Sequence, residues 1–229
     1  MQLNQAAREL TLKVVYYGPA LSGKTTNLRA LYARMDKTVR GHLMTLDTAD
    51  DRTLFFDMLP LVFKTKGGMK LKLKLFTVPG QVMHNSTRRI VLQGADAIAF
   101  IADSQPTAKQ TNYDYWRNML DNLKENGLSL DQLPHVIQFN KADLADGDMD
   151  QEIARVRLES PEPVFTAQAI RGEGVAETFV GLMGITWDHL EKVHEFGAKL
   201  GLDKQSFLNE ILSALPPGET GAAPASPAV

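Results

Sequence analysis

The residues GPALSGKT at positions 18–25 constrain this chain more than any other segment. They fit the pattern G-x-x-x-x-G-K-[ST], and they lie between a β-branched and aromatic run at 11–17 and a helical repeat of apolar residues. At such a turn, backbone N–H groups and the helix dipole converge on an anion. The alternative, a glycine-rich turn with an exposed lysine, is disfavoured by this position, so the segment predicts a phosphate-binding loop.

Each specified position of this loop has a chemical role. Gly18 and Gly23 permit backbone angles and a close approach that a Cβ would block. We expect Lys24 to reach the β- and γ-phosphates, and the Thr25 hydroxyl to ligate Mg²⁺, a hard cation that takes oxygen ligands. The predicted phosphate site comprises Gly18, Leu21, Ser22, Gly23, Lys24, Thr25 and Thr26.

A second segment, FNKAD at 139–143, indicates the base. It follows a predicted central strand, so its polar side chains emerge where open α/β sheets bind ligands. Asp143 can accept hydrogen bonds from guanine N1 and the 2-amino group together, whereas adenine lacks this pair of donors. Asn140 and Lys141 are expected to brace the pocket, and the backbone N–H of Ala169 to reach the guanine oxygen. Alone, the pattern fits a solvated turn equally well; the phosphate loop upstream favours guanine.

Strand-like and helix-like segments alternate along the chain, which predicts a doubly wound α/β fold. The apolar runs at 97–103 and 135–143 are typical of strands buried on both faces. A last strand at 163–167 precedes a long helix that begins near Val175. We expect a central, mostly parallel six-stranded sheet with helices on both faces.

Residues 69–76 alternate lysine with apolar side chains, as in a half-buried strand. Lys70, Lys72 and Lys74 then share one face. The commoner use of such a row is to protect an exposed strand face and edge, and the other is to attract an acidic partner.

The α/β pattern ends near residue 196. Residues 1–196 are expected to form one domain, and 197–229 a C-terminal extension. In this extension an amphipathic stripe predicts a short helix over about 204–215, followed by a disordered tail rich in Pro, Ala and Gly. The helix is equally compatible with binding a partner and with packing back on the domain.

Composition excludes several classes of protein. The chain has 25 Lys plus Arg and 27 Asp plus Glu, a net charge of −2, which implies no overall attraction to nucleic acid. It has no cysteine, and residue 2 is Gln rather than Gly, so no lipid anchor is expected. Its longest apolar stretch is too short to span a bilayer. These features predict a cytoplasmic protein.

The chain resembles a Ras-type small GTPase, a P-loop NTPase, and is specifically similar to the bacterial MglA family. The motifs that carry the resemblance, in family order over roughly residues 8–196, are GPALSGKTT at 18–26, DRTLFFDMLP at 51–60, TVPGQ at 77–81, VIQFNKAD at 136–143 and TAQAI at 166–170. The resemblance implies a switch between GTP and GDP forms. Two loops, expected at about 38–58 and 78–94, would sense the γ-phosphate.

The resemblance also implies which residues hydrolyse GTP. Gln81 occupies the position of the glutamine that orients the attacking water, and Arg52 resembles an arginine finger supplied by the chain's own switch. Thr53 resembles the threonine that closes on Mg²⁺ and the γ-phosphate, which the backbone N–H of Gly80 also approaches. For Arg52 the alternative is a surface cation beside two aspartates.

Two departures from the small-GTPase pattern bear on this chemistry. Thr77 stands where most of these proteins have an aspartate that holds Mg²⁺ through water. We therefore expect a metal site with one carboxylate fewer, which depends on phosphate oxygens, Thr25 and Thr53. Ala20 replaces a glycine, and a methyl group projecting near Gln81 predicts slow intrinsic hydrolysis.

By resemblance, the expected role is control of bacterial cell polarity and gliding motility. The implied partners are a homodimeric roadblock-fold activator, MglB, and effectors that bind the GTP form, with recruitment to a cell pole by partner proteins. One alternative is a GTP-dependent scaffold that binds effectors and hardly hydrolyses GTP, for which Ala20 is an argument. A P-loop kinase is disfavoured because the chain has no arginine-rich lid and the FNKAD segment would have no purpose there.

Overall fold

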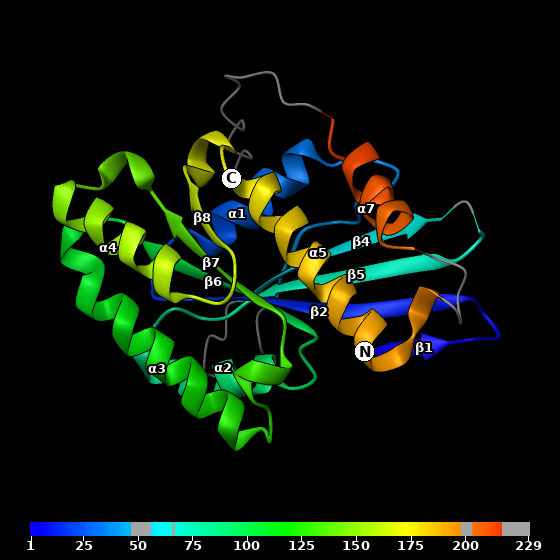
Figure 1. Ribbon diagram of the computed structural model, residues 1–229, viewed down its shortest axis with the longest axis horizontal. Coiled ribbons are helices and arrows are strands. Elements are labelled where there is room, and N and C mark those ends of the chain that lie inside the picture. The colour runs from blue at the N-terminus through cyan, green and yellow to red at the C-terminus, as the bar shows by residue number, and fades with distance from the viewer. Residues whose placement is uncertain (47–55, 66, 198–202, 217–229) are drawn as a thin grey trace.

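The structure, a computed structural model, describes residues 1–46, 56–65, 67–197 and 203–216. An eight-stranded sheet runs through the molecule in the order β3-β4-β5-β2-β6-β7-β8, with β1 beside β2 (Figure 1). Four of its strand pairs are parallel, namely β2–β5, β2–β6, β6–β7 and β7–β8. The strands are β1 (Gln2–Asn4), β2 (Glu9–Tyr17), β3 (Met44–Leu46), β4 (Phe56–Lys64), β5 (Lys70–Thr77), β6 (Ala97–Asp103), β7 (His135–Asn140) and β8 (Val164–Ala167). The doubly wound, mostly parallel sheet predicted from the sequence is confirmed.

The number of strands differs from the predicted six. The two additional strands, β1 and β3, pair antiparallel with β2 and β4 and have three residues each. Such short strands are too brief to show a period of two in the sequence. Strand β4 begins at Phe56, so the last three residues of the loop expected at 38–58 belong to the sheet instead.

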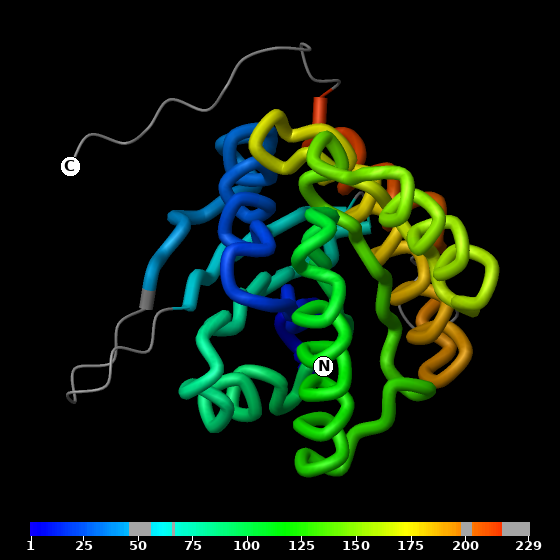
Figure 2. Tube along the Cα trace, turned by 90° about the vertical axis from the view of Figure 1, so that its left-hand side faces the viewer, coloured from blue at the N-terminus to red at the C-terminus, as the bar shows by residue number. Residues whose placement is uncertain are grey.

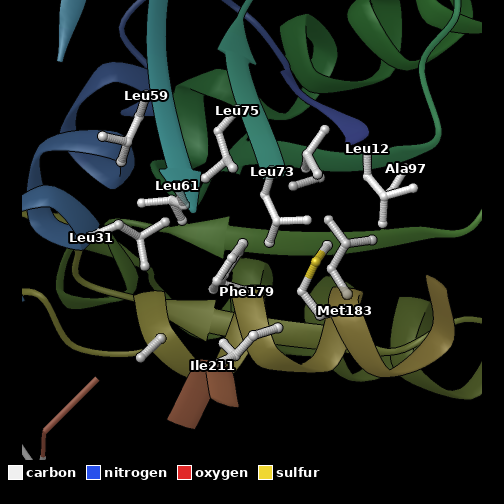
Figure 3. Close-up of a cluster of buried hydrophobic side chains, with 14 of the residues drawn as sticks. Leu12, Leu31, Leu59, Leu61, Leu73, Leu75, Ala97, Phe179, Met183 and Ile211 are labelled. Atoms are coloured by element: carbon white, nitrogen blue, oxygen red, sulfur yellow. The ribbon is translucent and has the colours of Figure 1, made fainter. Parts of the chain in front are cut away.

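Three helices cover one face of the sheet: α1 (Lys24–Arg34), α5 (Val175–His194) and α7 (Lys204–Ser213). Leucines from β2, β4 and β5 point toward Phe179 and Met183 of α5, and Ile211 of α7 joins the same cluster (Figure 3). Phe207 of α7 is fully buried, and its ring centroid lies 5.0 Å from that of Trp187 on α5. Helix α7 is therefore part of the main hydrophobic core.

The helices α2 (Asn85–Leu92), α3 (Lys109–Glu125) and α4 (Gly147–Glu159) pack on the other face. The long green helix nearest the viewer in Figure 2 is α3. These helices bury the face of β6 and β7 and, on β2, Val15 and Tyr17. On this face of β5 they reach Phe76 but leave Lys70 and Lys74 exposed.

Strands β2, β5, β6, β7 and β8 run parallel, so their carboxyl ends meet along one edge of the sheet. The segments that follow β2, β5, β7 and β8 are those predicted to bind phosphate, sense the γ-phosphate and recognise the base. This edge is where open α/β sheets bind ligands. Among the described helices, none is both long and apolar enough to cross a membrane.

Candidate nucleotide-binding site

The loop at 18–25 fits its surroundings only because two positions are glycine. Gly18 has φ 144°, and a Cβ there would lie 2.2 Å from the carbonyl oxygen of Ile101 on β6. Gly23 has φ 96°, and its Cβ would lie 2.0 Å from Nδ2 of Asn140. Both positions combine a backbone angle that favours glycine with a lack of space for a side chain. The loop is thus held tightly between the ends of β6 and β7.

Lys24 points back into this loop. Its ammonium donates hydrogen bonds to the carbonyl oxygens of Gly18 at 2.9 Å and Pro19 at 2.5 Å, and the residue is 6% exposed. The pKa of Lys24 is lowered to about 7, chiefly by burial and also by the nearby charge of Arg88, while the carboxylate of Asp57 opposes both effects. An ammonium that is poorly solvated and that bonds, among the residues described, only to carbonyls is well placed to exchange them for phosphate oxygens.

A carboxylate that sequence reasoning missed lies beside Thr25. The Thr25 hydroxyl donates to Oδ2 of Asp57 at 2.5 Å, and the Thr77 hydroxyl lies 3.3 Å from the same oxygen. Thr77 Oγ1 also accepts from the Asp57 N–H at 2.8 Å, and Thr45 donates to Oδ1 at 2.9 Å. Asp57 on β4 thus places a carboxylate beside Thr25 and Thr77, where the sequence predicted one carboxylate fewer than in most small GTPases.

The sequence held a signal for Asp57. It is in phase with Leu59, Leu61 and Phe63, the buried face of β4, and is itself 7% exposed. A carboxylate on the buried face of a strand is costly unless it is hydrogen-bonded or binds a cation, so it marks a site. Hydroxyl and carboxylate oxygens are also the hard ligands that suit Mg²⁺. Thr53, the other predicted metal ligand, and Arg52 both lie outside the described residues.

The second predicted switch segment, 78–94, is largely helical. A short 3-10 helix at Val82–His84 leads directly into α2. At the start of the segment, Gly80 lies against the phosphate loop, and a Cβ there would come within 2.4 Å of the Cα of Ala20. The Gln81 side chain is exposed, and its Oε1 lies 3.1 Å from Nε2 of His84.

Two residues that the sequence analysis did not single out hold this segment in place. Arg88 of α2 is 2% exposed, and its guanidinium donates to the carbonyls of Gln81 at 2.5 Å and Val82 at 3.2 Å. From α3, the Tyr115 hydroxyl donates to the carbonyl of Gly80 at 2.5 Å. The sequence signal was Arg88 itself, a charge three residues before the buried Val91 on the same helix face.

The predicted base site is built around Asn140, which is 3% exposed. Its Nδ2 donates to the carbonyl of Ser22 at 2.8 Å, and its Oδ1 accepts from the N–H of Ala169 at 2.9 Å. Asn140 therefore ties the phosphate loop to the segment after β8. In this structure the Ala169 amide is bonded to Asn140 rather than open to a ligand.

The neighbours of Asn140 take two different positions. Lys141 has φ 60° and forms an ion pair with Asp103 at 2.5 Å, which orients its stem. Asp143 is exposed and has no hydrogen bond or ion pair with any described residue. A carboxylate without a partner at the carboxyl end of β7 is free to accept hydrogen bonds from a base.

Phosphate-loop residues, Asp57, Thr77, Gly80 and Gln81 line one cavity of about 490 Å³. This volume lies in the range of small-ligand sites. Another cavity, of about 570 Å³, lies between α3 and α4 and is lined largely by apolar side chains. The two share no lining residue, and only the first is lined by the phosphate loop together with Asp57 and Thr77.

Comparison with known proteins decides the family. No protein-family model matches the chain. The chain is 39% identical over 190 residues to "Mutual gliding-motility protein MglA" of Myxococcus xanthus (strain DK1622), and the match covers 83% of this chain and 97% of the relative. The chain belongs to the MglA family of Ras-like small GTPases. Its resemblance to this family, first seen in five short motifs, is confirmed.

In this MglA-family chain, the described site residues form two groups at one edge of the sheet. One group comprises the phosphate loop from Gly18 to Thr26, Asp57, Thr77, Gly80 and Gln81. The other comprises Asn140, Lys141, Asp143 and Ala169. Asn140 joins them through its bonds to Ser22 and Ala169. Leu21, predicted as part of the phosphate site, lines the cavity of the first group, and the residue is 87% exposed.

Proposed function

We propose that this chain binds GTP and GDP together with Mg²⁺, hydrolyses GTP to GDP and phosphate, and acts as a switch that controls bacterial cell polarity and gliding motility. The observation that carries the proposal is the hydrogen bond from Asn140 to the carbonyl of Ser22, which joins the loop that holds Lys24 and Thr25 to the segment that holds the free carboxylate of Asp143. Motility comes from the likeness to the Myxococcus xanthus protein, whose name refers to it.

Thr25, Asp57 and Thr53 are the residues that we assign to Mg²⁺. Thr25 and Asp57 are already in contact, and their oxygens match the preference of this cation. When bound, Mg²⁺ would neutralise charge that develops on the β- and γ-phosphates. Hydrogen bonds with Thr77 on β5 hold Asp57 on β4, and the Asp57 carboxylate thus lies beside the phosphate loop.

Binding of the phosphates would draw Lys24 away from the carbonyls of Gly18 and Pro19. The ammonium would then be fully charged, because phosphate oxygens favour the protonated form. Gln81 would turn from His84 toward the attacking water, for which its amide can donate to one oxygen and accept from another. Arg52 would stabilise charge on the transferring phosphoryl group. Contact between Gly80 and Ala20 leaves little room for this rearrangement, which favours slow hydrolysis by the chain alone.

A protein partner is expected to accelerate hydrolysis. Leu21, Val82 and Met83 are at least 80% exposed, although all three are apolar and lie in or beside the phosphate loop and the second switch segment. Exposed apolar side chains grouped at a functional site are typical of contact surfaces. This arrangement supports an MglB-like, roadblock-fold homodimer as activator, effectors that recognise the GTP form, and recruitment to a cell pole through such partners.

Single-turnover hydrolysis of GTP tests the enzymatic part of the proposal. Gln81→Leu and Arg52→Ala should each bind GTP as the wild type does and lower the hydrolysis rate at least tenfold. Gln93→Leu, an exposed glutamine at the end of α2, is the matched control and should leave the rate unchanged. Unchanged rates in both catalytic variants would refute these roles. Binding without hydrolysis, with or without an MglB-like partner, would establish the scaffold alternative.

A further inference from the structure

Part of one face of the sheet has no helix over it. Along β5 the side chains alternate, and Leu71, Leu73 and Leu75 are buried beneath α1, α5 and α7. On the opposite face of the same strand, Lys70 and Lys74 are exposed and Lys72 is half-buried. This uncovered area extends over the neighbouring strands β4 and β2.

The strand register gathers lysines in this area. Lys70 lies opposite Lys64 on β4, and Lys74 lies opposite Lys13 on β2. With Lys72 these make five lysines against two acidic side chains, Glu9 and Asp96, in a chain whose net charge is −2. We refer to Lys13, Lys64, Lys70, Lys72 and Lys74 as the lysine face.

The lysine face does not protect a strand edge. Strand β5 lies between β4 and β2 and is hydrogen-bonded to both, so its backbone offers no free edge to another chain. The edge-protecting part of the role expected for these lysines is therefore wrong. Like charges directly opposite each other, as at Lys13–Lys74 and Lys64–Lys70, reduce sheet stability. These lysine pairs thus lower the stability of the sheet, and protection of an edge does not explain why they are present.

The lysines differ in their available partners. Lys72 forms an ion pair of 2.7 Å with Glu9, and Lys13 donates to the carbonyl of Gln93 at 2.8 Å. Lys64, Lys70 and Lys74 have neither a hydrogen bond nor an ion pair within the described part of the chain. Burial lowers the pKa of Lys13, Asp96 opposes this shift, and the charge of Lys74 adds to it. Three ammonium groups therefore remain free for an external anion.

An apolar row runs beside the lysines. Met58, Pro60 and Val62 of β4 lie on the same face as Lys72 and Lys74, with Pro60 opposite Lys74 and Val62 opposite Lys72. Neighbouring strands are about 4.8 Å apart, so the apolar and basic rows are adjacent. All three apolar residues are half-buried, and none of them is exposed.

We propose that the lysine face docks an acidic polypeptide segment of a partner protein. Carboxylates of the segment would pair with Lys64, Lys70 and Lys74, and its apolar side chains would lie on Met58, Pro60 and Val62. An anionic membrane is disfavoured because membrane-binding surfaces insert exposed apolar side chains, which this row lacks. The proposal does not depend on GTP hydrolysis.

Fluorescence anisotropy with a defined peptide tests this proposal. The probe is a labelled 12-residue peptide of alternating Glu and Leu, and a Glu and Ser peptide of equal charge tests the apolar row. Lys70→Glu combined with Lys74→Glu should weaken binding of the Glu and Leu peptide at least tenfold. The matched control, Lys124→Glu with Lys192→Glu, changes the charge equally on exposed positions of α3 and α5 and should bind as the wild type does.

Lys70→Gln combined with Lys74→Gln repeats the test without adding negative charge. Two controls, thermal unfolding and GDP binding, show whether each variant is folded and still binds nucleotide. The expected order is stronger binding of the Glu and Leu peptide than of the Glu and Ser peptide, with both weakened by salt. Equal peptide binding by the wild type and both double variants would overturn the proposal. So would binding to phosphatidylglycerol vesicles without binding to either peptide.

Discussion

The hydroxyl of Thr25 donates a 2.5 Å hydrogen bond to the carboxylate of Asp57 on β4. The pattern of most small GTPases would place an aspartate on β5 instead. Thr77 stands at the usual aspartate position on β5 and contacts the same carboxylate oxygen from the neighbouring strand. The carboxylate beside Thr25 is therefore supplied by β4, and the β5 position holds a threonine.

Asp57→Asn should weaken Mg²⁺-dependent retention of nucleotide. The amide keeps the size of the side chain and loses the charge that attracts the cation. We expect the Mg²⁺ concentration that half-maximally slows GDP dissociation to rise at least tenfold. Asp148→Asn, an exposed position in the first turn of α4, is the control and should behave as the wild type does. An unaltered Mg²⁺ dependence in Asp57→Asn would remove Asp57 from the metal site.

Nucleotide binding should take up a proton at pH 8. The pKa of Lys24 is about 7 in the free chain, below the ordinary value of 10.5, so Lys24 is mostly neutral at pH 8. Phosphate restores its charge, and close to one proton per nucleotide should enter the complex. Affinity should therefore fall as the pH rises above about 7. Calorimetry in two buffers of different ionisation enthalpy measures this uptake, and its absence at pH 8 would contradict the lowered pKa.

The lowered pKa of Lys24 should also make the stability of the nucleotide-free protein depend on pH. Between pH 7 and 10.5 the unfolded chain binds more protons at Lys24 than the folded chain does. The free energy of unfolding from this group should therefore increase with pH across that interval. Lys24→Met should remove this dependence, whereas Lys37→Met, at an exposed position, should retain it.

Tyr115→Phe should slow hydrolysis by loosening Gly80 and, with it, Gln81. The change removes the hydroxyl that donates to the carbonyl of Gly80. A neutral hydrogen bond contributes about 1 kcal/mol, which corresponds to a rate about fivefold lower. Tyr113→Phe, two residues away on the exposed side of α3, should leave the single-turnover rate unchanged. Equal effects of the two substitutions would exclude a positioning role for Tyr115.

Phe207→Ala tests how much α7, which was expected to lie in a C-terminal extension, contributes to the stability of the core. Phe207 is fully buried among core residues, so its truncation should lower the free energy of unfolding by about 3–5 kcal/mol. Leu212→Ala on the same helix removes a side chain that is 48% exposed and should cost about 1 kcal/mol or less. Urea unfolding gives both values. A small, equal loss in the two variants would mean that α7 contributes little to the core.

Much of the fold could be predicted because its signals are local. The apolar run at 97–103 coincides with β6, and the helix expected from Val175 begins at that residue as α5. Alternation along residues 69–76 likewise marked β5, which spans Lys70–Thr77. Each pattern reflects burial of the segment itself and needs no knowledge of its neighbours.

The missed features depend on contacts between distant segments. Asp57 meets Thr25 and Thr77 only because β4 pairs antiparallel with β5 beside the phosphate loop. Arg88 contacts the site because its guanidinium reaches from α2 to the carbonyls of Gln81 and Val82 in the preceding turn. The spacing of residues in the sequence does not show which strands pair or which segments meet. A charged residue on an otherwise apolar face did mark Asp57 and Arg88 as unusual.

The central claim, recognition of guanine by Asp143, is tested most directly by a change of base specificity. A carboxylate accepts from N1 and the 2-amino group of guanine, whereas an amide can accept from N1 and donate to the 2-oxo group of xanthine. Calorimetry of wild type and Asp143→Asn with GTP, XTP and ATP should show that the wild type binds GTP alone. The variant should lose GTP and gain XTP. Binding of ATP by the wild type, or unchanged base preference in Asp143→Asn, would contradict the account.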